Sequence, residues 1–232
     1  MNNIGLLIIA TNKYNVFVEP LIKSADQFFM NKKPFSENKV TYFVFTDEPL
    51  DIESKREIVY IPVRHKAWPW MTLGRYKIFN DNKDILSNMS YLFYSDVDMR
   101  FVNHVDEEIL SERVATIHPG FNGGRGTPET NPASLACVSP DEQMTYFAGG
   151  FNGGTSEEYL KMSEKLSSNI QKDHDNRIIA VWHDESHMNR YFIDNPPIKV
   201  LDPSYCHPGY NPKTDSTKLI ALVKNHKDYR ND

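Results

Sequence analysis

A nearly unbroken apolar run at residues 4–10, Ile-Gly-Leu-Leu-Ile-Ile-Ala, constrains the fold more than any other feature of the chain. Such a run is typical of a strand buried on both faces, as in a parallel sheet. Similar strand patterns follow at residues 40–45, 57–63 and 91–94, and apolar residues at helical spacing lie between them, at 19–30 and 72–86. This alternation predicts βα units around a mostly parallel sheet.

The second half of the chain has a different pattern. Residues 118–140 are rich in Gly, Pro, Asn, Thr and Ser, which predicts long functional loops, with short edge strands at 114–117 and 135–138. Residues 156–171 predict an amphipathic helix with Ser156 as its N-cap, and residues 184–192 predict another. Beyond residue 203 the chain is turn-rich and polar.

Composition narrows the class of protein. With 232 residues, 40% of them hydrophobic, the chain suits a single domain with a sizeable core. A net charge of -5 without a long basic stretch argues against a nucleic-acid partner. Cys137 and Cys206 fit neither a zinc spacing nor a disulfide scaffold, which predicts two buried free thiols. Because no segment resembles a signal peptide or a membrane span, we expect a soluble, cytoplasmic protein without a membrane anchor.

The first candidate site is Asp96-Val97-Asp98, which directly follows a predicted strand. In open α/β sheets, ligands bind at the carboxyl ends of strands. Alternation at the strand end places both carboxylates around one point, with Val97 facing away. Paired oxygen ligands of this kind suit Mg²⁺ or Mn²⁺ holding a diphosphate. The alternative is a solvated acidic turn.

The second candidate is the run Trp-His-Asp-Glu-Ser-His at residues 182–187. His183 and His187 are one helical turn apart and could bind zinc, but the Glu is displaced by one position from the His-Glu-x-x-His order of zinc proteases. Asp184 could instead cap a helix. The third interpretation is that the run carries a catalytic carboxylate.

Two glycine-rich stretches, residues 118–121 and 146–154, form the third candidate. Glycines let a backbone approach a ligand closely, yet both stretches lack the phosphate-loop and dinucleotide patterns. Turns or bulges are the alternative.

Together these motifs, with Lys224-Asn225-His226, come in the order found in glycosyltransferase family 6, which they resemble from Tyr14 to Arg230. That family includes the histo-blood-group A and B transferases, the α1,3-galactosyltransferase and bacterial relatives. The resemblance implies a GT-A fold: one Rossmann-like α/β domain with a mixed, mostly parallel sheet, merged with an acceptor-binding part. Residues 1–100 would mainly bind UDP, 101–220 would mainly bind the acceptor, and 221–232 would form a flexible tail.

The resemblance also implies roles for single residues. Asp96 and Asp98 would hold the metal and the diphosphate beside Val97, and Glu185 would act at the reacting carbon as a nucleophile or as an electrostatic stabiliser. Further donor contacts would come from Ile9, Thr11, Tyr14, Arg75, Ala148, Gly149, Gly150, Asp184, Lys224 and Arg230. Acceptor contacts would come from His118, Thr130 and Trp182, together with Glu185.

The expected activity is that of a retaining α1,3-glycosyltransferase. It would move GalNAc or galactose from UDP-GalNAc or UDP-Gal to an oligosaccharide acceptor, a galactoside with or without fucose, using Mn²⁺ or Mg²⁺. Both aspartates are present where some bacterial members have Asn-x-Asn, so metal dependence is expected. The missing anchor and stem of mammalian members favour a bacterial or phage type. The loop at residues 123–131 departs from the family pattern, which leaves the acceptor open. The alternatives are a metal-dependent nucleotidyltransferase or phosphohydrolase, and a sugar-binding module without turnover.

Overall fold

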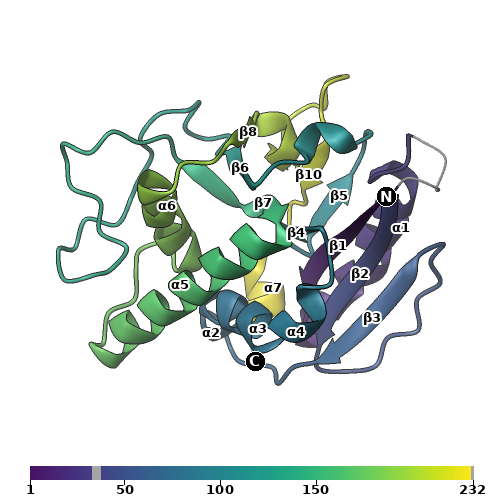
Figure 1. The fold of residues 1–232 in the computed structure, drawn as a ribbon, viewed down its shortest axis with the longest axis horizontal. Helices are drawn as coiled ribbons and strands as arrows, with labels where there is room; N and C mark the ends of the chain where they lie inside the picture. The colour runs from purple at the N-terminus through teal and green to yellow at the C-terminus, as the bar shows by residue number, and fades with distance from the viewer. Residues whose placement is uncertain (33–37, 231–232) are drawn as a thin grey trace.

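A seven-stranded sheet with the order β3-β2-β1-β4-β7-β6-β8 forms the centre of the computed structural model, which describes residues 1–32 and 38–230 (Figure 1). All its strands run parallel to one another except β7, which is antiparallel to both neighbours. The predicted mixed, mostly parallel α/β sheet is therefore confirmed. The strands are β1 (Asn2–Ile9), β2 (Asn38–Thr46), β3 (Glu57–Pro62), β4 (Tyr91–Ser95), β6 (Arg113–Ile117), β7 (Phe147–Thr155) and β8 (Lys199–Leu201).

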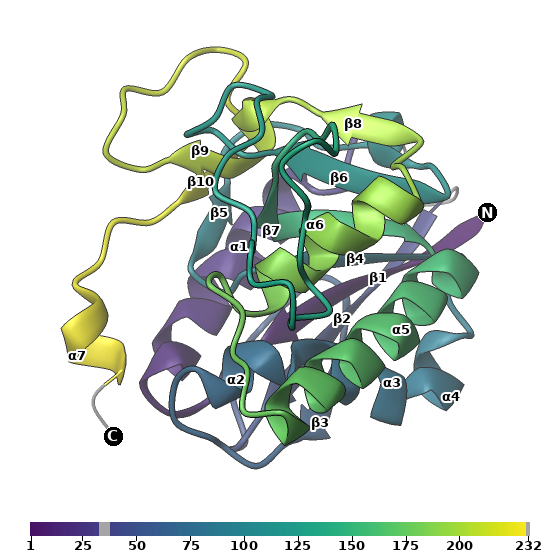
Figure 2. The same cartoon turned by 90° about the vertical axis from the view of Figure 1, so that its left-hand side faces the viewer.

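Helices cover both faces of this sheet (Figures 1 and 2). One face packs against α1 (Val18–Phe28), the other against α3 (Arg75–Asp81), α5 (Ser156–Asp175) and α6 (Asp184–Asp194). A second, three-stranded sheet has the order β5-β10-β9. The remaining elements are η1 (Asn12–Phe17), α2 (Trp70–Leu73), α4 (Lys83–Leu86), β5 (Met99–Phe101), η2 (Glu107–Ile109), η3 (Pro203–Cys206), β9 (His207–Pro208), β10 (Leu219–Ala221) and α7 (His226–Arg230).

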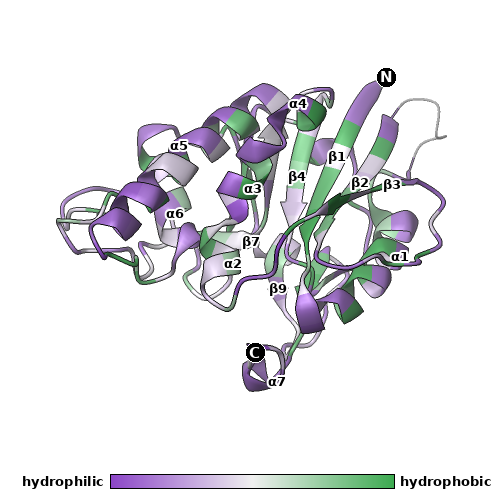
Figure 3. Cartoon of the chain, turned by 90° about the horizontal axis from the view of Figure 1, so that it is seen from below, coloured by the Kyte–Doolittle hydropathy of each residue, from purple (hydrophilic) through white to green (hydrophobic). Residues whose placement is uncertain are grey.

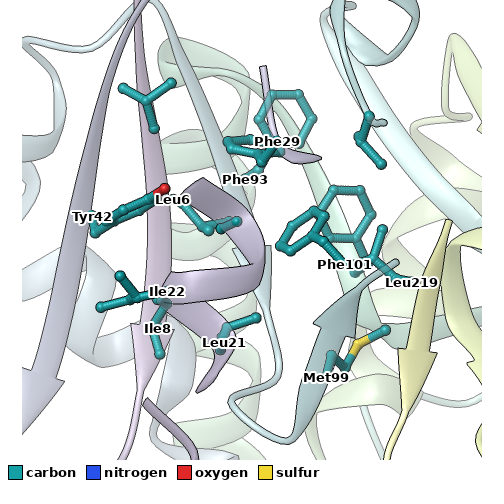
Figure 4. Packing of buried hydrophobic residues seen from close by; sticks show 14 of the residues in the cluster. Leu6, Ile8, Leu21, Ile22, Phe29, Tyr42, Phe93, Met99, Phe101 and Leu219 are labelled. Carbon is teal, nitrogen blue, oxygen red and sulfur yellow. The ribbon is translucent and has the colours of Figure 1, made fainter. Parts of the chain in front are cut away.

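Two hydrophobic clusters, one on each side of the sheet, form the core. Figure 4 shows the α1 side, where Leu21 and Ile22 pack against Ile8 of β1 and Phe29 meets Phe101 with ring centroids 5.3 Å apart. The hydropathy colouring of Figure 3 shows apolar residues concentrated along β1 and β4. The core strands are apolar on both faces because both faces are covered.

The glycine-rich segment before α5 is a strand and not a set of turns, but its ladder with β6 has a break in register of the bulge type: Ala115 pairs with Asn152, and Thr116 pairs with Ala148. A Cβ at Gly153 would lie 2.3 Å from the Phe93 ring, and one at Gly154 would lie 2.1 Å from the Glu112 carbonyl oxygen. Glycine is therefore required here by the close approach of neighbouring strands. The glycines that favour a loop in the sequence are the residues that let β7 lie in the middle of the sheet.

Three other expectations were wrong in detail. Residues 135–138 form a turn and not a strand, because the Leu135 N–H is bonded to the Asp173 carboxylate and is unavailable to a ladder. Residues 72–86 are divided among α2, α3 and α4. Ser156 does not cap α5: its hydroxyl donates to the Met89 carbonyl, and Thr155 precedes the helix. Cys137 and Cys206 are free thiols as predicted, both half-buried.

Among the residues that the structure describes, no helix is long and apolar enough to cross a membrane.

Candidate functional site

The predicted site residues gather where the strands end. The carboxyl ends of β1, β4 and β6 and the start of the reversed strand β7 lie at one edge of the sheet. A cavity of about 360 Å³ opens there. Ten predicted residues line it: Ile9, Thr11, Tyr14, Arg75, Asp96, Val97, Asp98, Trp182, Lys224 and Arg230.

Arg75, the first residue of α3, lies at the centre of the site. Its Nη2 donates to Asp96 Oδ1 at 3.1 Å and its Nη1 donates to the Gly149 carbonyl oxygen at 3.0 Å. Its Nε is 3.1 Å from Asp184 Oδ2, an ion pair whose angle lies outside hydrogen-bond geometry. The guanidinium also lies 4.0 Å from the centre of the Tyr94 ring. One rigid, buried fork thus fixes β4, β7 and α6 relative to one another.

Asp96 and Asp98 provide oxygen ligands at the end of β4. Asp96 Oδ1 is already bonded to the Tyr94 hydroxyl at 2.6 Å and to Arg75, which leaves Oδ2 available. Asp98 forms an ion pair with Lys224. Among residues 1–32 and 38–230, no group of three or more His, Cys, Asp or Glu side chains could hold a metal ion. The two aspartates fit a divalent cation that takes its other ligands from a diphosphate and water.

Glu185 lies next to this array at the start of α6. Its Oε2 accepts from the Gly149 N–H at 2.7 Å and its Oε1 accepts from the Tyr146 hydroxyl at 2.9 Å. Burial raises the pKa of Glu185 to about 7, even though both hydrogen bonds oppose the rise. Burial also raises the pKa of Asp184 to about 6, against the effect of Arg75. Two consecutive carboxyl groups therefore titrate near neutral pH, as is common at functional sites.

The turn before α6 aims these carboxyl groups into the site. His183 has a φ of +56°, a conformation that costs free energy for a residue with a side chain. His183 contacts the Trp68 ring, whereas His187 is buried 3.5 Å from Asp173 of α5. The two histidines do not converge, so the zinc interpretation is wrong. Asp184, the first residue of α6, pairs with Arg75, and His183 occupies the N-cap position without a capping side-chain hydrogen bond.

The C-terminal segment closes one side of the cavity. Lys224, His226, Tyr229 and Arg230 line it. The Tyr229 ring is 5.5 Å from the Tyr14 ring, and the Arg230 guanidinium lies 4.7 Å from the centre of the Trp68 ring. Lys224 therefore lies beside Asp98, and Arg230 lines the same cavity, where an anionic ligand would bind. The last two residues of the predicted tail, 231–232, lie outside the described residues.

The other seven predicted site residues do not line the cavity: His118, Thr130, Ala148, Gly149, Gly150, Asp184 and Glu185. The Gly150 carbonyl oxygen accepts from the Asp96 N–H at 2.9 Å, and Ala148 is buried at the start of β7. His118 stacks on Phe121 and meets the ring of Tyr146, which links it to Glu185. Thr130 is exposed, and its backbone N–H donates to the Glu129 carboxylate.

The loop of residues 118–146 is an insertion between two paired strands. It leaves β6 at Ile117 and returns to β7 at Phe147, and these two residues are partners in the ladder. The loop lies beside α6 in both Figure 1 and Figure 2. It carries His118 at one end and Tyr146 at the other, so that both ends are held at the site.

Several residues of the site were not predicted to be functional from the sequence. Tyr94 could have been found, because it lies two residues before Asp96 on the same face of the strand end. His65, which shares a hydrogen bond of 2.8 Å with Thr11, carries no pattern that separates it from ordinary loop residues, and Tyr146 was predicted only as part of a glycine-rich stretch. Their roles come from tertiary contacts alone.

Comparison with known proteins agrees with this geometry. The sequence profile described as "Glycosyltransferase family 6" matches residues 1–231. Histo-blood group ABO system transferase 1 of Rattus norvegicus is 36% identical over 243 residues, which cover 98% of this chain and 68% of that protein. Globoside alpha-1,3-N-acetylgalactosaminyltransferase 1 of Homo sapiens is 32% identical over 236 residues, covering 97% and 67%. O-antigen biosynthesis glycosyltransferase WbnI of Escherichia coli is 25% identical over 232 residues, covering 97% of each chain.

Proposed function

The chain belongs to glycosyltransferase family 6, and on that premise we propose that it is a retaining α1,3-glycosyltransferase. It moves GalNAc or galactose from the UDP-sugar to a galactoside acceptor, with a divalent cation. The observation that carries the proposal is the Arg75 fork, which joins Asp96 at the diphosphate end to Asp184 and Gly149 at the sugar end. Glu185 is bonded to the same Gly149.

Asp96 and Asp98 are the residues that would hold the cation, Mn²⁺ or Mg²⁺. When bound, it would neutralise charge on the departing diphosphate. Lys224 and Arg230 add positive charge at the same place, and the closed C-terminal segment limits the access of water. Thr11 and Tyr14, at the end of β1, are positioned to contact the uridine.

Glu185 acts at the reacting carbon, and two courses give retention. In one, its carboxylate attacks the anomeric carbon as the bond to UDP breaks, and the acceptor hydroxyl then displaces Glu185. In the other, Glu185 stabilises positive charge on the sugar while a UDP oxygen takes the acceptor proton. Both courses require the ionised form of Glu185.

We propose GalNAc as the preferred donor sugar. Ala148 has a small side chain and Gly150 has none, and small residues at these two positions favour a donor with a larger group at C2. The name of the human relative, a globoside α-1,3-N-acetylgalactosaminyltransferase, supports the same choice.

The test is UDP release from UDP-GalNAc and from UDP-galactose, with Mn²⁺, Mg²⁺ or EDTA, and with or without fucosylated galactosides. Release that requires metal and rises with an acceptor supports the proposal, and the faster sugar identifies the donor. Binding of UDP without release in any combination would instead favour a binding module.

A further inference from the structure

Glu129, a buried carboxylate outside the cavity, fastens the loop of residues 118–146 to α6. It is 8% exposed. Its Oε1 accepts from the N–H groups of Thr130 and Asn131, at 2.8 and 2.7 Å. Its Oε2 accepts from the Val181 N–H at 2.8 Å, directly before Trp182. One side chain therefore joins the loop to the segment that leads into Glu185.

A second contact between the same two segments lies beside it. The indole Nε1 of Trp182 donates to the Thr127 hydroxyl at 2.8 Å. The Trp182 ring is 49% exposed and lines the cavity. Its orientation is therefore set from the loop side, and the loop is held in turn by Glu129.

Asp173 anchors the far end of this part of the loop to α5. Its carboxylate accepts from the Ser134 hydroxyl at 2.5 Å and from the Leu135 N–H at 2.9 Å, and it is 2% exposed. The buried His187 of α6 lies 3.5 Å from it. Burial lowers the pKa of His187 to about 4, so the imidazole of His187 is uncharged at neutral pH. Glu129 and the Thr127 contact thus connect the loop directly to the segment of Val181 and Trp182.

We propose that Glu129 is a positioning residue that determines acceptor binding, by fixing Trp182 and the loop relative to Glu185. This inference rests on the proposed transferase function. A carboxylate suits the position because all its partners are N–H donors and both oxygens accept. A glutamine would have to turn its amide N–H₂ toward either the loop amides or the Val181 N–H, so either the two loop contacts or the Val181 contact would be lost.

The first variant is Glu129→Gln, measured for the KM of the acceptor, for kcat, and for UDP release without acceptor. We expect the acceptor KM to rise about tenfold, which corresponds to ~1.4 kcal/mol of lost binding. UDP release without acceptor should stay within about twofold, because the donor contacts are untouched. Thr127→Val, which is nearly isosteric and frees the Trp182 indole, should shift the acceptor KM in the same direction.

The matched control is Asp106→Asn. Asp106 is also buried, at 9% exposed, and its Oδ1 accepts from the N–H groups of Asn31 and Lys32 at 2.8 and 3.0 Å, far from the site. The Asp106→Asn variant should be less stable than the wild type, with an unchanged acceptor KM. If Glu129→Gln changes donor turnover and acceptor KM equally, or behaves like the control, the positioning role is wrong.

Hydrogen exchange by mass spectrometry separates this inference from the proposed function. In Glu129→Gln, peptides covering residues 123–139 and 178–183 should exchange faster, with the rest of the chain unchanged. If the wild type transfers no sugar and yet these peptides respond, the transferase proposal fails and the fastening by Glu129 stands. Unchanged exchange in both peptides would refute the fastening, whatever the activity.

Discussion

The raised pKa of Glu185 makes a quantitative prediction about stability. A glutamate ordinarily titrates near 4.5, and burial raises the pKa of Glu185 to about 7 in the folded protein. At about 1.4 kcal/mol per pH unit, ionisation of Glu185 destabilises the folded state by about 3 kcal/mol. The unfolded chain releases the proton from pH 4.5 upward, whereas the folded protein keeps it until about pH 7. The cost therefore develops between these values and is complete above pH 7.

The perturbation is Glu185→Gln. The amide does not ionise, and it can still accept from the Gly149 N–H and donate to the Tyr146 oxygen. We expect the variant to be more stable than the wild type above pH 7 by up to about 3 kcal/mol, and nearly equal to it below pH 4.5. Transfer should fall by about a hundredfold or more, because the charge acts mainly in the transition state.

The assay is urea denaturation of both proteins without ligands at pH 5, 6, 7 and 8. Glu142→Gln is the control of opposite sign: Arg190 and the Ser139 N–H lower the pKa of Glu142, so its removal should destabilise at neutral pH, and this effect should fade on acidification. The reasoning would be refuted if the unfolding free energies of Glu185→Gln and the wild type differed by the same amount at every pH, or if the variant were the less stable protein at pH 8.

Three further predictions concern activity and ligand binding. Arg75→Lys should reduce kcat/KM for the donor by about a hundredfold, because an ammonium cannot bond Asp96 and Gly149 while pairing with Asp184. Steady-state UDP release would measure this loss, and near wild-type turnover would contradict the role of the fork. The kcat/KM of the wild type should fall as pH drops below about 7, because Glu185 and Asp184, with pKa values of about 7 and 6, become protonated; a flat profile from pH 5 to 8 would contradict this. Lys224→Ala should tighten Mn²⁺ binding to the protein without UDP, since Lys224 pairs with Asp98, and calorimetry would detect the change; weaker binding would be the opposite result.

The sequence predicted the strands of the first half well, because runs such as residues 4–10 must be buried on both faces. It did not predict the strand β7, where glycine favoured turns or bulges and the structure has a strand with a break in register. It also failed at residues 135–138, where the Asp173 side chain takes the N–H that a strand would need. The local pattern of apolar residues predicts burial well, but it does not predict which hydrogen-bond partner a backbone group has.

The residues of the candidate site were likewise predicted only in part. Asp96 and Asp98 could be located because they follow a strand end, and the resemblance supplied Arg75 and Glu185. The sequence did not indicate Glu129, and it marked Tyr146 only as part of a glycine-rich stretch, because their importance depends on contacts with residues 52 and 39 positions away. Such long-range pairings carry no periodicity that a single sequence can show.

The insertion of residues 118–146 between ladder partners has an evolutionary consequence. Ile117 and Phe147 stay paired however long the segment between them becomes. The free energy of closing such a segment rises slowly with its length, so its length and composition can change at small cost to the sheet. The residues proposed to act on the sugar bond lie at strand ends and at the start of a helix, whose positions tolerate no such change. The acceptor recognition proposed for this segment can therefore diverge as an exchangeable module, while the site at the strand ends stays the same.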